Sequence, residues 1–447
     1  MSPQISRRTA LIGLASASWG TRAQGAEGEA LELRSSSLRF EGEGAPASQL
    51  WTLGGREPGR LMRARVGESF GLSLTNKLDQ TTALHWQGLR LPNHMDALDV
   101  EAGASAQLRF TAREPGTYWC RPALWPSAAE QKARGLYGLL IVEGPGEPEV
   151  DRDLPFIFDD WRLDEAGQIK GPFPDLRDLR AEGRIGSLLT VNNRKAPASI
   201  SGRPGERLRL RILNACSARL MGVMFENLRA HVVSIDGHSC EPFEPARDML
   251  PMGPGARFDV VLDLPAEGEG RIWSRGGGLR REKGGEPDQL LILLKSEGSP
   301  RNARGPVVSR GNPQLPEQMR LQKAKRVEVS IATTGRNDVN AFWGFNGTPG
   351  DGTNTQALFK VDEGEIVTLA FTNRSPVPHS IHVQGHVMRV LHPLDDGWEP
   401  YWRDSVIIPP GRTVRTAFVA DNPGRWLIES TIMDFAAAGL VGWFEVG

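Results

Sequence analysis

Three segments of this 447-residue chain repeat one strand pattern. They read VGESFGLSLTN (residues 66–76), PGERLRLRILN (204–214) and EGEIVTLAFTN (363–373). Each begins at a Gly-Glu turn, continues with an apolar residue at every second position, and ends in asparagine. Alternation with a period of two places one face of a strand against a core. Three copies of such a strand predict an all-β chain built from three related domains.

The first and third of these domains share a second pattern. EPGTYWC and NPGRWLI each place a Pro-Gly turn before an aromatic strand. A short alanine-rich stretch then leads to GLYG or GLVG, which predicts a helix after the last core strand. Ser127 and Glu130 have the spacing of a capping box at the start of the first helix. Gly135 and Gly439 are placed to end the two helices.

These patterns divide the chain into consecutive parts. Each repeat copy belongs to a predicted two-sheet β-sandwich. The stretch between the second and third sandwiches is rich in Gly, Pro and Arg and has no periodicity, which is typical of a linker. The predicted order is an export signal at 1–26, a first domain at 31–146, a second at 148–296, the linker at 297–319 and a third domain at 320–447.

The first 26 residues have the order of an export signal. Ser6 precedes the pair Arg7-Arg8, an apolar stretch follows, and small residues near 23–26 offer a cleavage site. The string SRRTAL resembles the twin-arginine signal, which exports folded proteins; an ordinary secretory signal is the alternative. No other apolar run is long enough to span a bilayer. We therefore expect a periplasmic protein with no transmembrane anchor after signal cleavage.

Charge and cysteine content narrow the function classes further. The 53 basic residues balance 54 acidic ones, which gives no support for nucleic-acid binding. The three cysteines are Cys120, Cys216 and Cys240. Export permits a disulfide, and Cys216 and Cys240 lie in one predicted domain. The sequence leaves open whether these two pair, because it does not give their separation. Cys120 is expected to be a free thiol.

Four stretches then suggest a metal chemistry. They are ALHWQGL, GTYWCRPALWPSAAEQKARGLYG, VPHSIHVQGHVMRVL and RWLIESTIMDFAAAGLVG. With their spacing, they resemble the copper-binding segments of the three-domain multicopper oxidases, and LTVNNRKAPASISGRPGERLRLRILNACSARL resembles the middle domain of that family. The resemblance covers nearly the whole chain after the signal. It implies three cupredoxin-like Greek-key β-sandwich domains.

The resemblance also implies what an active member requires. A type 1 copper in the third domain, held by two His, a Cys thiolate and often a weak axial Met or Leu, takes electrons from the substrate. A trinuclear cluster between the first and third domains reduces oxygen to water. That cluster is normally held by histidines, on one type 2 copper and a type 3 pair. This chain has only eight His in total.

The resemblance places the family's ligand positions on particular residues here. His85 and His382 fall at type 2, and His379 falls at type 1. The other type 1 positions hold Ser430, Phe435 and the axial Leu440. The type 3 positions hold no histidine; they hold Gln87, Arg121, Ala123, Gln384, Glu429 and Thr431. Because a hydroxyl cannot replace a thiolate as a soft ligand and a phenyl ring offers no lone pair, we expect the type 1 and type 3 centres to be lost.

The substituted residues suggest what replaces the metals. Arg121 and Glu429 come from opposite domains and fall at neighbouring copper positions. A planar guanidinium fork suits a carboxylate, so we expect a salt bridge between Arg121 and Glu429 across the interface. The alternative is that Arg121 points to solvent.

The His85 and His382 pair allows two interpretations. One is a mononuclear site for copper or zinc, with His379 or His386 as a third ligand. The other is an inherited polar pair, hydrogen-bonded to Gln87, Gln384 or water. The remaining histidines are expected to be less specific: a solvated loop residue at His94, and ordinary surface or strand-end residues at His231, His238 and His392.

The leading functional prediction is a copper-depleted homologue that acts as a non-catalytic binding or scaffold protein with no cofactor. In this respect the chain resembles the twin-arginine-exported, cell-division-associated member of the superfamily, which implies a protein partner in the division machinery or envelope. The alternative is a protein that binds one copper ion, either as a carrier or as an oxidoreductase outside the four-copper mechanism. A third alternative is an enzyme that uses the emptied cleft without a metal. The sequence shows no nucleophile–base pair or nucleotide-binding loop that would support it.

Overall fold

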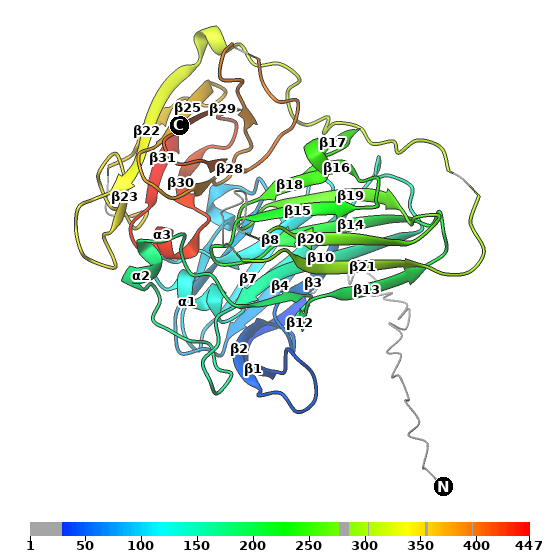
Figure 1. The fold of residues 1–447 in the computed structure, drawn as a ribbon. Coiled ribbons are helices and arrows are strands. Elements are labelled where there is room, and N and C mark those ends of the chain that lie inside the picture. The colour runs from blue at the N-terminus through cyan, green and yellow to red at the C-terminus, as the bar shows by residue number, and fades with distance from the viewer. Residues whose placement is uncertain (1–28, 277–285, 303, 354–355, 396) are drawn as a thin grey trace.

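The computed structural model describes residues 29–276, 286–302, 304–353, 356–395 and 397–447. The predicted export signal lies outside these residues. Six sheets pack as three two-sheet sandwiches in chain order, so the predicted all-β architecture is confirmed (Figure 1). Within the described residues, the helices are all short, and none has the length and apolar character needed to cross a membrane.

The first sandwich is formed by β1 to β9. Its first sheet, in spatial order, is β2 (Ser48–Leu53), β1 (Glu29–Leu38), β4 (Ser69–Asn76) and β7 (Ser105–Thr111). Its second sheet is β3 (Arg60–Arg65), β9 (Gly138–Glu143), β8 (Gly116–Pro122), β5 (Thr82–Gln87) and β6 (Leu98–Val100). The short helices η1 (Asn93–Met95) and α1 (Ala128–Ala133) lie in its connections.

The second sandwich is formed by β10 to β21. Its first sheet is β12 (Arg194–Lys195), β11 (Leu188–Val191), β10 (Arg152–Trp161), β14 (Arg207–Asn214), β19 (Arg257–Asp263), β16 (His231–Ile235) and β17 (His238–Phe243). Its second sheet is β13 (Ala198–Gly202), β21 (Gln289–Ser296), β20 (Glu269–Ser274), β15 (Met221–Glu226) and β18 (Met249–Met252). Its helices are α2 (Leu176–Leu179) and η2 (Ala246–Asp248).

The third sandwich is formed by β22 to β31. Its first sheet is β23 (Trp343–Phe345), β22 (Lys325–Thr333), β25 (Ile366–Asn373), β29 (Thr413–Val419) and β27 (Arg389–Val390). Its second sheet is β24 (Phe359–Val361), β31 (Val441–Val446), β30 (Gly424–Ser430), β26 (His379–Val383) and β28 (Ser405–Ile408). The helices are η3 (Leu321–Lys323) and α3 (Met433–Ala437).

The three repeat copies form the equivalent strands β4, β14 and β25. Each pairs in parallel with the first strand of its sandwich and antiparallel with a later strand. The terminal asparagine has the same role in each copy. The side-chain amides of Asn76, Asn214 and Asn373 donate to carbonyls of the opposite sheet, while their oxygens accept the backbone N–H two residues ahead. The repeated asparagine therefore joins the two sheets of every sandwich.

Helices α1 and α3 follow the strands that carry the aromatic pattern, as predicted. Gly135 and Gly439 end them at φ values of 100° and 104°, a conformation that favours glycine. The predicted capping box is wrong: Ser127 has helical backbone angles and its hydroxyl donates to the Leu124 carbonyl. Glu130 instead accepts a hydrogen bond from Arg134, one turn ahead in the same helix. The two helices pack together where the first and third sandwiches meet (Figure 1).

The three cysteines are buried free thiols, so Cys216 and Cys240 form no disulfide. Cys216 lies just beyond β14, whereas Cys240 lies in β17. In the sheet, β19 and β16 separate these strands, which places them roughly 14 Å apart at normal strand spacing. A disulfide requires Cα atoms within about 7 Å.

The predicted linker has no strand or helix in its described residues until η3. Its end is nevertheless anchored, because Leu315 and Met319 are buried in a cluster with Trp402 of the third sandwich. Asn312 also donates a hydrogen bond to Glu114 of the first sandwich.

Candidate functional site

His85 and His382 meet at the interface between the first and third sandwiches. The Nε2 atoms of the two rings are 3.0 Å apart, and both side chains are 1% exposed. Their positions follow from strand register. His85 in β5 lies opposite Arg121 in β8, and His382 in β26 lies opposite Glu429 in β30. Directly opposed residues project from the same face of a sheet, so both pairs point into this interface.

The other nitrogen of each ring has an acceptor. His85 Nδ1 lies 2.7 Å from a carboxylate oxygen of Asp96, and His382 Nδ1 lies 2.8 Å from the Asp404 backbone carbonyl. Because these oxygens accept, the contacts place a proton on Nδ1 of each ring and leave a lone pair at Nε2 of a neutral His85 ring. Burial lowers the pKa of His85, which favours its neutral form, although Asp96 opposes this shift. The two Nε2 atoms therefore face each other at 3.0 Å, a geometry that a proton or a metal ion shared between the rings would stabilise.

Arg121 and Glu429 form a buried ion pair beside the two imidazoles. Glu429 also accepts hydrogen bonds from Gln384 Nε2 at 3.1 Å and from Trp125 Nε1 at 2.8 Å. Arg121 donates from Nε to the Gln87 side-chain oxygen at 3.0 Å. Burial alone raises the pKa of Glu429, but the positive charge of Arg121 and the two imidazoles lower it to about 2. The carboxylate is thus charged and bonded through both oxygens.

A second ion pair extends this network to the second sandwich. Gln87 donates to Asp404 at 3.0 Å, and Arg257 pairs with the other oxygen of Asp404. Arg257 also donates to the backbone carbonyl of Asp236 at 2.7 Å. Burial would raise the pKa of Asp404, but Arg257 and His382 hold it well below its usual range. Burial and the nearby Asp404 charge raise the pKa of Asp236.

The sequence interpretation missed Asp96, Asp404, Arg257, Asp236 and Trp125. Asp96 lies in the loop of His94, and it is the carboxylate rather than the exposed imidazole of that loop that reaches the site. Arg257 and Asp404 each stand directly at or before an apolar strand. A charged residue at the start of an apolar strand is the sequence signal that could have identified Arg257 and Asp404 as site residues.

His379 does not join the His85 and His382 pair. It is three residues before His382 in β26, and the period of two places these side chains on opposite faces of the strand. The His379 ring packs against those of Trp343 and Phe435, with centroids 4.8 and 5.2 Å away, and these two rings also contact each other. Its Nε2 contacts the Ser375 hydroxyl at 3.0 Å, and burial lowers its pKa to about 3. Within the described residues, its Nδ1 has no hydrogen-bond partner.

Ser430 and Thr431, at predicted type 1 and type 3 positions, form hydrogen bonds with backbone groups of their own sandwich. Ser430 Oγ accepts the Ile432 N–H at 3.1 Å, and the Thr431 hydroxyl donates to the Ser380 carbonyl at 3.4 Å. The apolar members of the predicted set, Ala123, Phe435 and Leu440, are buried.

The remaining histidines are separate from this interface. His386 is surrounded by Phe418, Trp426 and Phe444, and burial lowers its pKa to about 4. His231 is partly exposed and His392 is exposed, as expected. His238 is a strand-end residue, as expected, because it begins β17, but it is buried. Its Nδ1 lies 3.2 Å from Glu114 of the first sandwich, so its surroundings are an interdomain contact.

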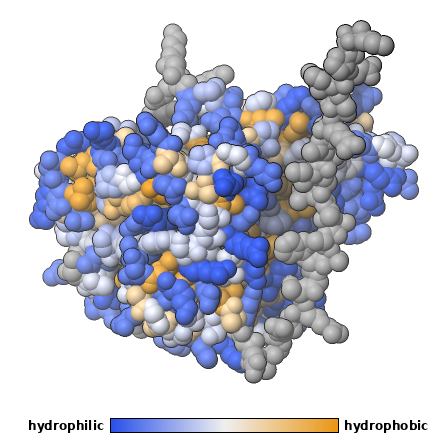
Figure 2. Space-filling model, turned by 90° about the horizontal axis from the view of Figure 1, so that it is seen from below, coloured by the Kyte–Doolittle hydropathy of each residue, from blue (hydrophilic) through white to orange (hydrophobic). Residues whose placement is uncertain are grey.

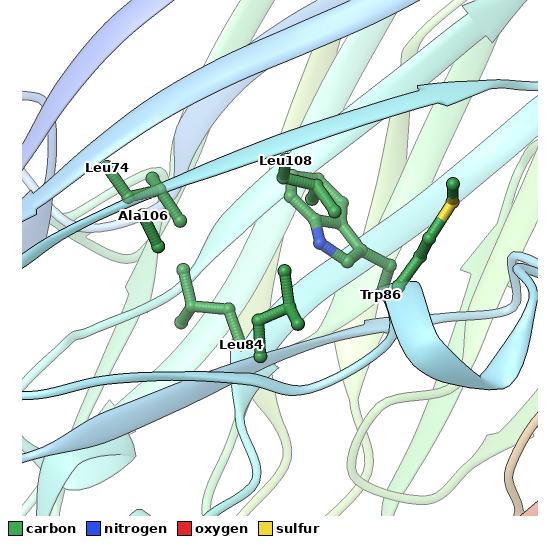
Figure 3. A pocket seen from close by; sticks show the side chains of 7 residues that line it. Leu74, Leu84, Trp86, Ala106 and Leu108 are labelled. Carbon is green, nitrogen blue, oxygen red and sulfur yellow. The ribbon is translucent and has the colours of Figure 1, made fainter.

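Two other features do not form a reactive site. Asp159, Asp160 and Cys216 lie close enough to hold a metal, but Lys132 already binds Asp159 at 2.8 Å and Arg219 binds Asp160 at 2.9 Å. A hollow of about 10 Å³ in the first sandwich is lined by apolar side chains (Figure 3). Its lining residues are Leu74, Leu84, Trp86, Met95, Leu98, Ala106 and Leu108. It has room for at most one water.

Stability in acid is expected to depend on Glu429. Its pKa is about 2 in the folded chain and about 4.5 when unperturbed, so its ionised form stabilises the fold above pH 4.5. That contribution is lost as the pH falls from 4.5 towards 2. The difference in unfolding free energy between wild type and Glu429→Gln should therefore shrink through this window, measured by urea denaturation. A difference that is constant with pH would contradict this assignment.

Comparison with known proteins gives one consistent family. Three family models described as multicopper oxidase match residues 36–147, 164–290 and 312–447, which together make up most of the chain. Multicopper oxidase MmcO of Mycobacterium tuberculosis is 29% identical over 436 residues, which cover 86% of this chain and 81% of that protein. Multicopper oxidase mco of Staphylococcus aureus is 23% identical over 404 residues, 87% of this chain and 82% of that one. The crystal structure of a multi-copper oxidase from Pseudomonas Thermotolerans superimposes with a TM-score of 0.82 at 27% identity, covering 94% of this chain and 99% of that structure.

Proposed function

Because this chain belongs to the multicopper oxidase superfamily, we propose that it is a member without type 1 and type 3 copper centres, acting as a non-catalytic binding or scaffold protein. The observation that carries the proposal is the buried pair of Arg121 and Glu429. These residues stand where the family resemblance places type 3 ligands. A guanidinium cation there disfavours a neighbouring dication, and the carboxylate oxygens are already bonded.

The residues present do not fit the family's other reactive copper. A type 1 centre needs a thiolate and a second imidazole beside His379. The chain offers Ser430 and Phe435 at those positions, and the His379 ring packs against those of Phe435 and Trp343. The Ser430 hydroxyl oxygen is a hard ligand, and it already accepts a hydrogen bond from a backbone N–H. The relatives described above are named as oxidases. We propose that this chain differs from them in function because it has Ser430 and Phe435 at the type 1 positions.

The proposed location is the periplasm, supported by the SRRTAL string at the N-terminus. The proposed partner is a protein of the envelope or the division machinery, as the resemblance to the cell-division-associated homologue suggests. The described residues include only three exposed large hydrophobic side chains, Leu98, Val308 and Leu394. On the face seen in Figure 2, hydrophobic groups are small and interspersed with hydrophilic ones. A partner of this chain would therefore bind through a largely polar surface.

Oxygen consumption tests the loss of catalysis. The copper-loaded protein, supplied with a phenolic or cuprous electron donor, is expected to consume no more oxygen than the same amount of free copper ion. It should also lack the intense blue absorption of a thiolate-bound copper. Saturable oxygen uptake that requires the protein, together with a blue band, would overturn the proposal.

A second candidate function is favoured by the geometry of His85 and His382. The Nε2 atoms of His85 and His382, which are 3.0 Å apart, would hold a single metal ion, and imidazole nitrogen is a ligand that suits Cu²⁺. Asp96 and the Asp404 carbonyl orient the two rings for this role. The candidate is a protein holding a single Cu²⁺, with solvent completing the coordination.

Copper binding distinguishes the scaffold protein without metal from the protein that holds a single Cu²⁺. Under the second candidate, one Cu²⁺ per chain is expected to bind with a type 2-like electron paramagnetic resonance spectrum. Asp96→Asn should weaken that binding about 10–100-fold, because it removes the carboxylate that orients His85. Unchanged affinity in that variant would argue against a site at His85.

A further inference from the structure

The Arg-rich start of the predicted linker forms a hollow on the second sandwich. The hollow lies between the turn that follows β13 and the chain that follows β21, and its volume is about 390 Å³. It is lined by Arg203, Pro300, Arg301, Asn302 and Arg304. The sequence pattern marked this stretch as a linker, but three guanidinium groups around one hollow need a further explanation.

Arg203 carries an unneutralised charge. Its Nε donates to the Ser299 carbonyl at 2.9 Å, and one terminal nitrogen donates to the Pro300 carbonyl at 3.3 Å. Both partners are neutral. In the described part of the chain, no carboxylate lies within ion-pair distance of its guanidinium. The carbonyls therefore fix the orientation of Arg203 and leave its positive charge available.

Arg301 and Arg304 share one carboxylate. Both form an ion pair with the same oxygen of Asp151, at 3.0 and 2.5 Å, and Arg304 also reaches the highly exposed Glu149 at 3.2 Å. The backbone N–H of Arg207 and these two guanidiniums lower the pKa of Asp151, although burial acts in the opposite direction. The lining thus has three cations, and the carboxylates that pair with two of them are Asp151 and the exposed Glu149.

The walls of the hollow are fixed by backbone hydrogen bonds. The Arg301 N–H donates to the Pro204 carbonyl at 2.8 Å, and the Glu297 N–H donates to the Gly202 carbonyl at 2.7 Å. Arg207 donates from its side chain to the Gly305 carbonyl at 2.9 Å. These contacts hold the linker against the β13 turn, so the arginines are positioned before any ligand arrives.

We propose that this hollow binds a phosphorylated small molecule or headgroup of the diphosphate class. Guanidinium forks bind phosphate oxygens bidentately, and three of them match a ligand with more than one anionic group. A volume of about 390 Å³ exceeds what a single phosphate fills and lies in the range of small-molecule sites. The proposal uses none of the residues around His85 and His382, so it does not depend on whether those residues bind a metal.

Calorimetric titration of the full chain with pyrophosphate, at fixed ionic strength, tests the proposal. Saturable binding is expected, and Arg203→Gln should weaken it at least tenfold. Arg229→Gln is the matched control, because it removes the same charge from an exposed arginine of the same sandwich and should leave the affinity unchanged. Absence of saturable pyrophosphate and vesicle binding, or an equal loss in both variants, would overturn the proposal.

Vesicles distinguish the source of the phosphate. Sedimentation is measured with vesicles containing an anionic phospholipid and with pure phosphatidylcholine vesicles. Binding to the anionic vesicles that Arg203→Gln abolishes assigns the hollow to a lipid headgroup. Pyrophosphate binding without vesicle binding assigns it to a soluble ligand. Either result supports the phosphate chemistry, since both depend on Arg203.

Discussion

Replacing Arg121 with alanine is expected to lower the free energy of unfolding by about 3–5 kcal/mol. The substitution leaves the Glu429 carboxylate buried and charged, with 0% of its side chain exposed and no cation bonded to it. Hydrogen bonds from Trp125 and Gln384 would persist, but they do not neutralise the charge. Urea denaturation followed by tryptophan fluorescence measures the change. It represents a large fraction of the stability of a typical domain.

Two variants make this expectation specific. Replacing both partners, as Arg121→Met with Glu429→Leu, should recover most of the lost stability, since removing a buried ion pair as a whole is often neutral. Arg65→Ala is the exposed control, because its contact with Glu143 is long and solvated and should be worth under about 1 kcal/mol. If Arg121→Ala costs no more than Arg65→Ala, the pair does not stabilise the interface between the first and third sandwiches.

Replacing Arg257 with alanine is expected to cost a similar amount, about 3–5 kcal/mol. Arg257 is fully buried, pairs with Asp404 and donates to the backbone of Asp236 and Gly255. Its loss leaves Asp404 charged beside Asp236, in the middle of all three sandwiches. Gly88 shows how closely the site is packed, since a Cβ there would lie 2.4 Å from the Arg257 guanidinium.

The pH dependence identifies the cause of that loss. In wild type, Arg257 and His382 hold the pKa of Asp404 well below its usual range. Without Arg257, the buried carboxyl group of Asp404 favours its protonated form. The destabilisation of Arg257→Ala should therefore decrease as the pH falls. A loss below about 1 kcal/mol near neutral pH, or one that grows in acid, would show that Arg257 does not serve as the counter-ion of Asp404.

The fold could be predicted from the sequence because its signals are local. Alternation in the three repeat copies identified β4, β14 and β25, and the Pro-Gly turns identified the strands before α1 and α3. The pairing of Arg121 with Glu429 was also predicted, because the aligned segments placed both at one interface. These inferences needed only the period of a strand and the order of short motifs.

The network behind the site could not be predicted in this way. Asp404, Arg257 and Asp236 meet because three sandwiches pack together, and no local periodicity encodes that packing. His379, one of the two alternatives for a third ligand, cannot join His382, because three residues along a strand reverse the direction of a side chain. A disulfide between Cys216 and Cys240 stays open in the sequence, because the sequence does not show the two strands that lie between them.

The metal content of the copper-loaded, desalted protein tests the central claim most directly. Elemental mass spectrometry of wild type, His85→Ala and His382→Ala is expected to give at most one copper per chain, and none in either variant. A value near zero in wild type would favour the scaffold interpretation, and a value near one would favour the mononuclear site. Three or four coppers per chain would contradict the loss of the type 1 and type 3 centres.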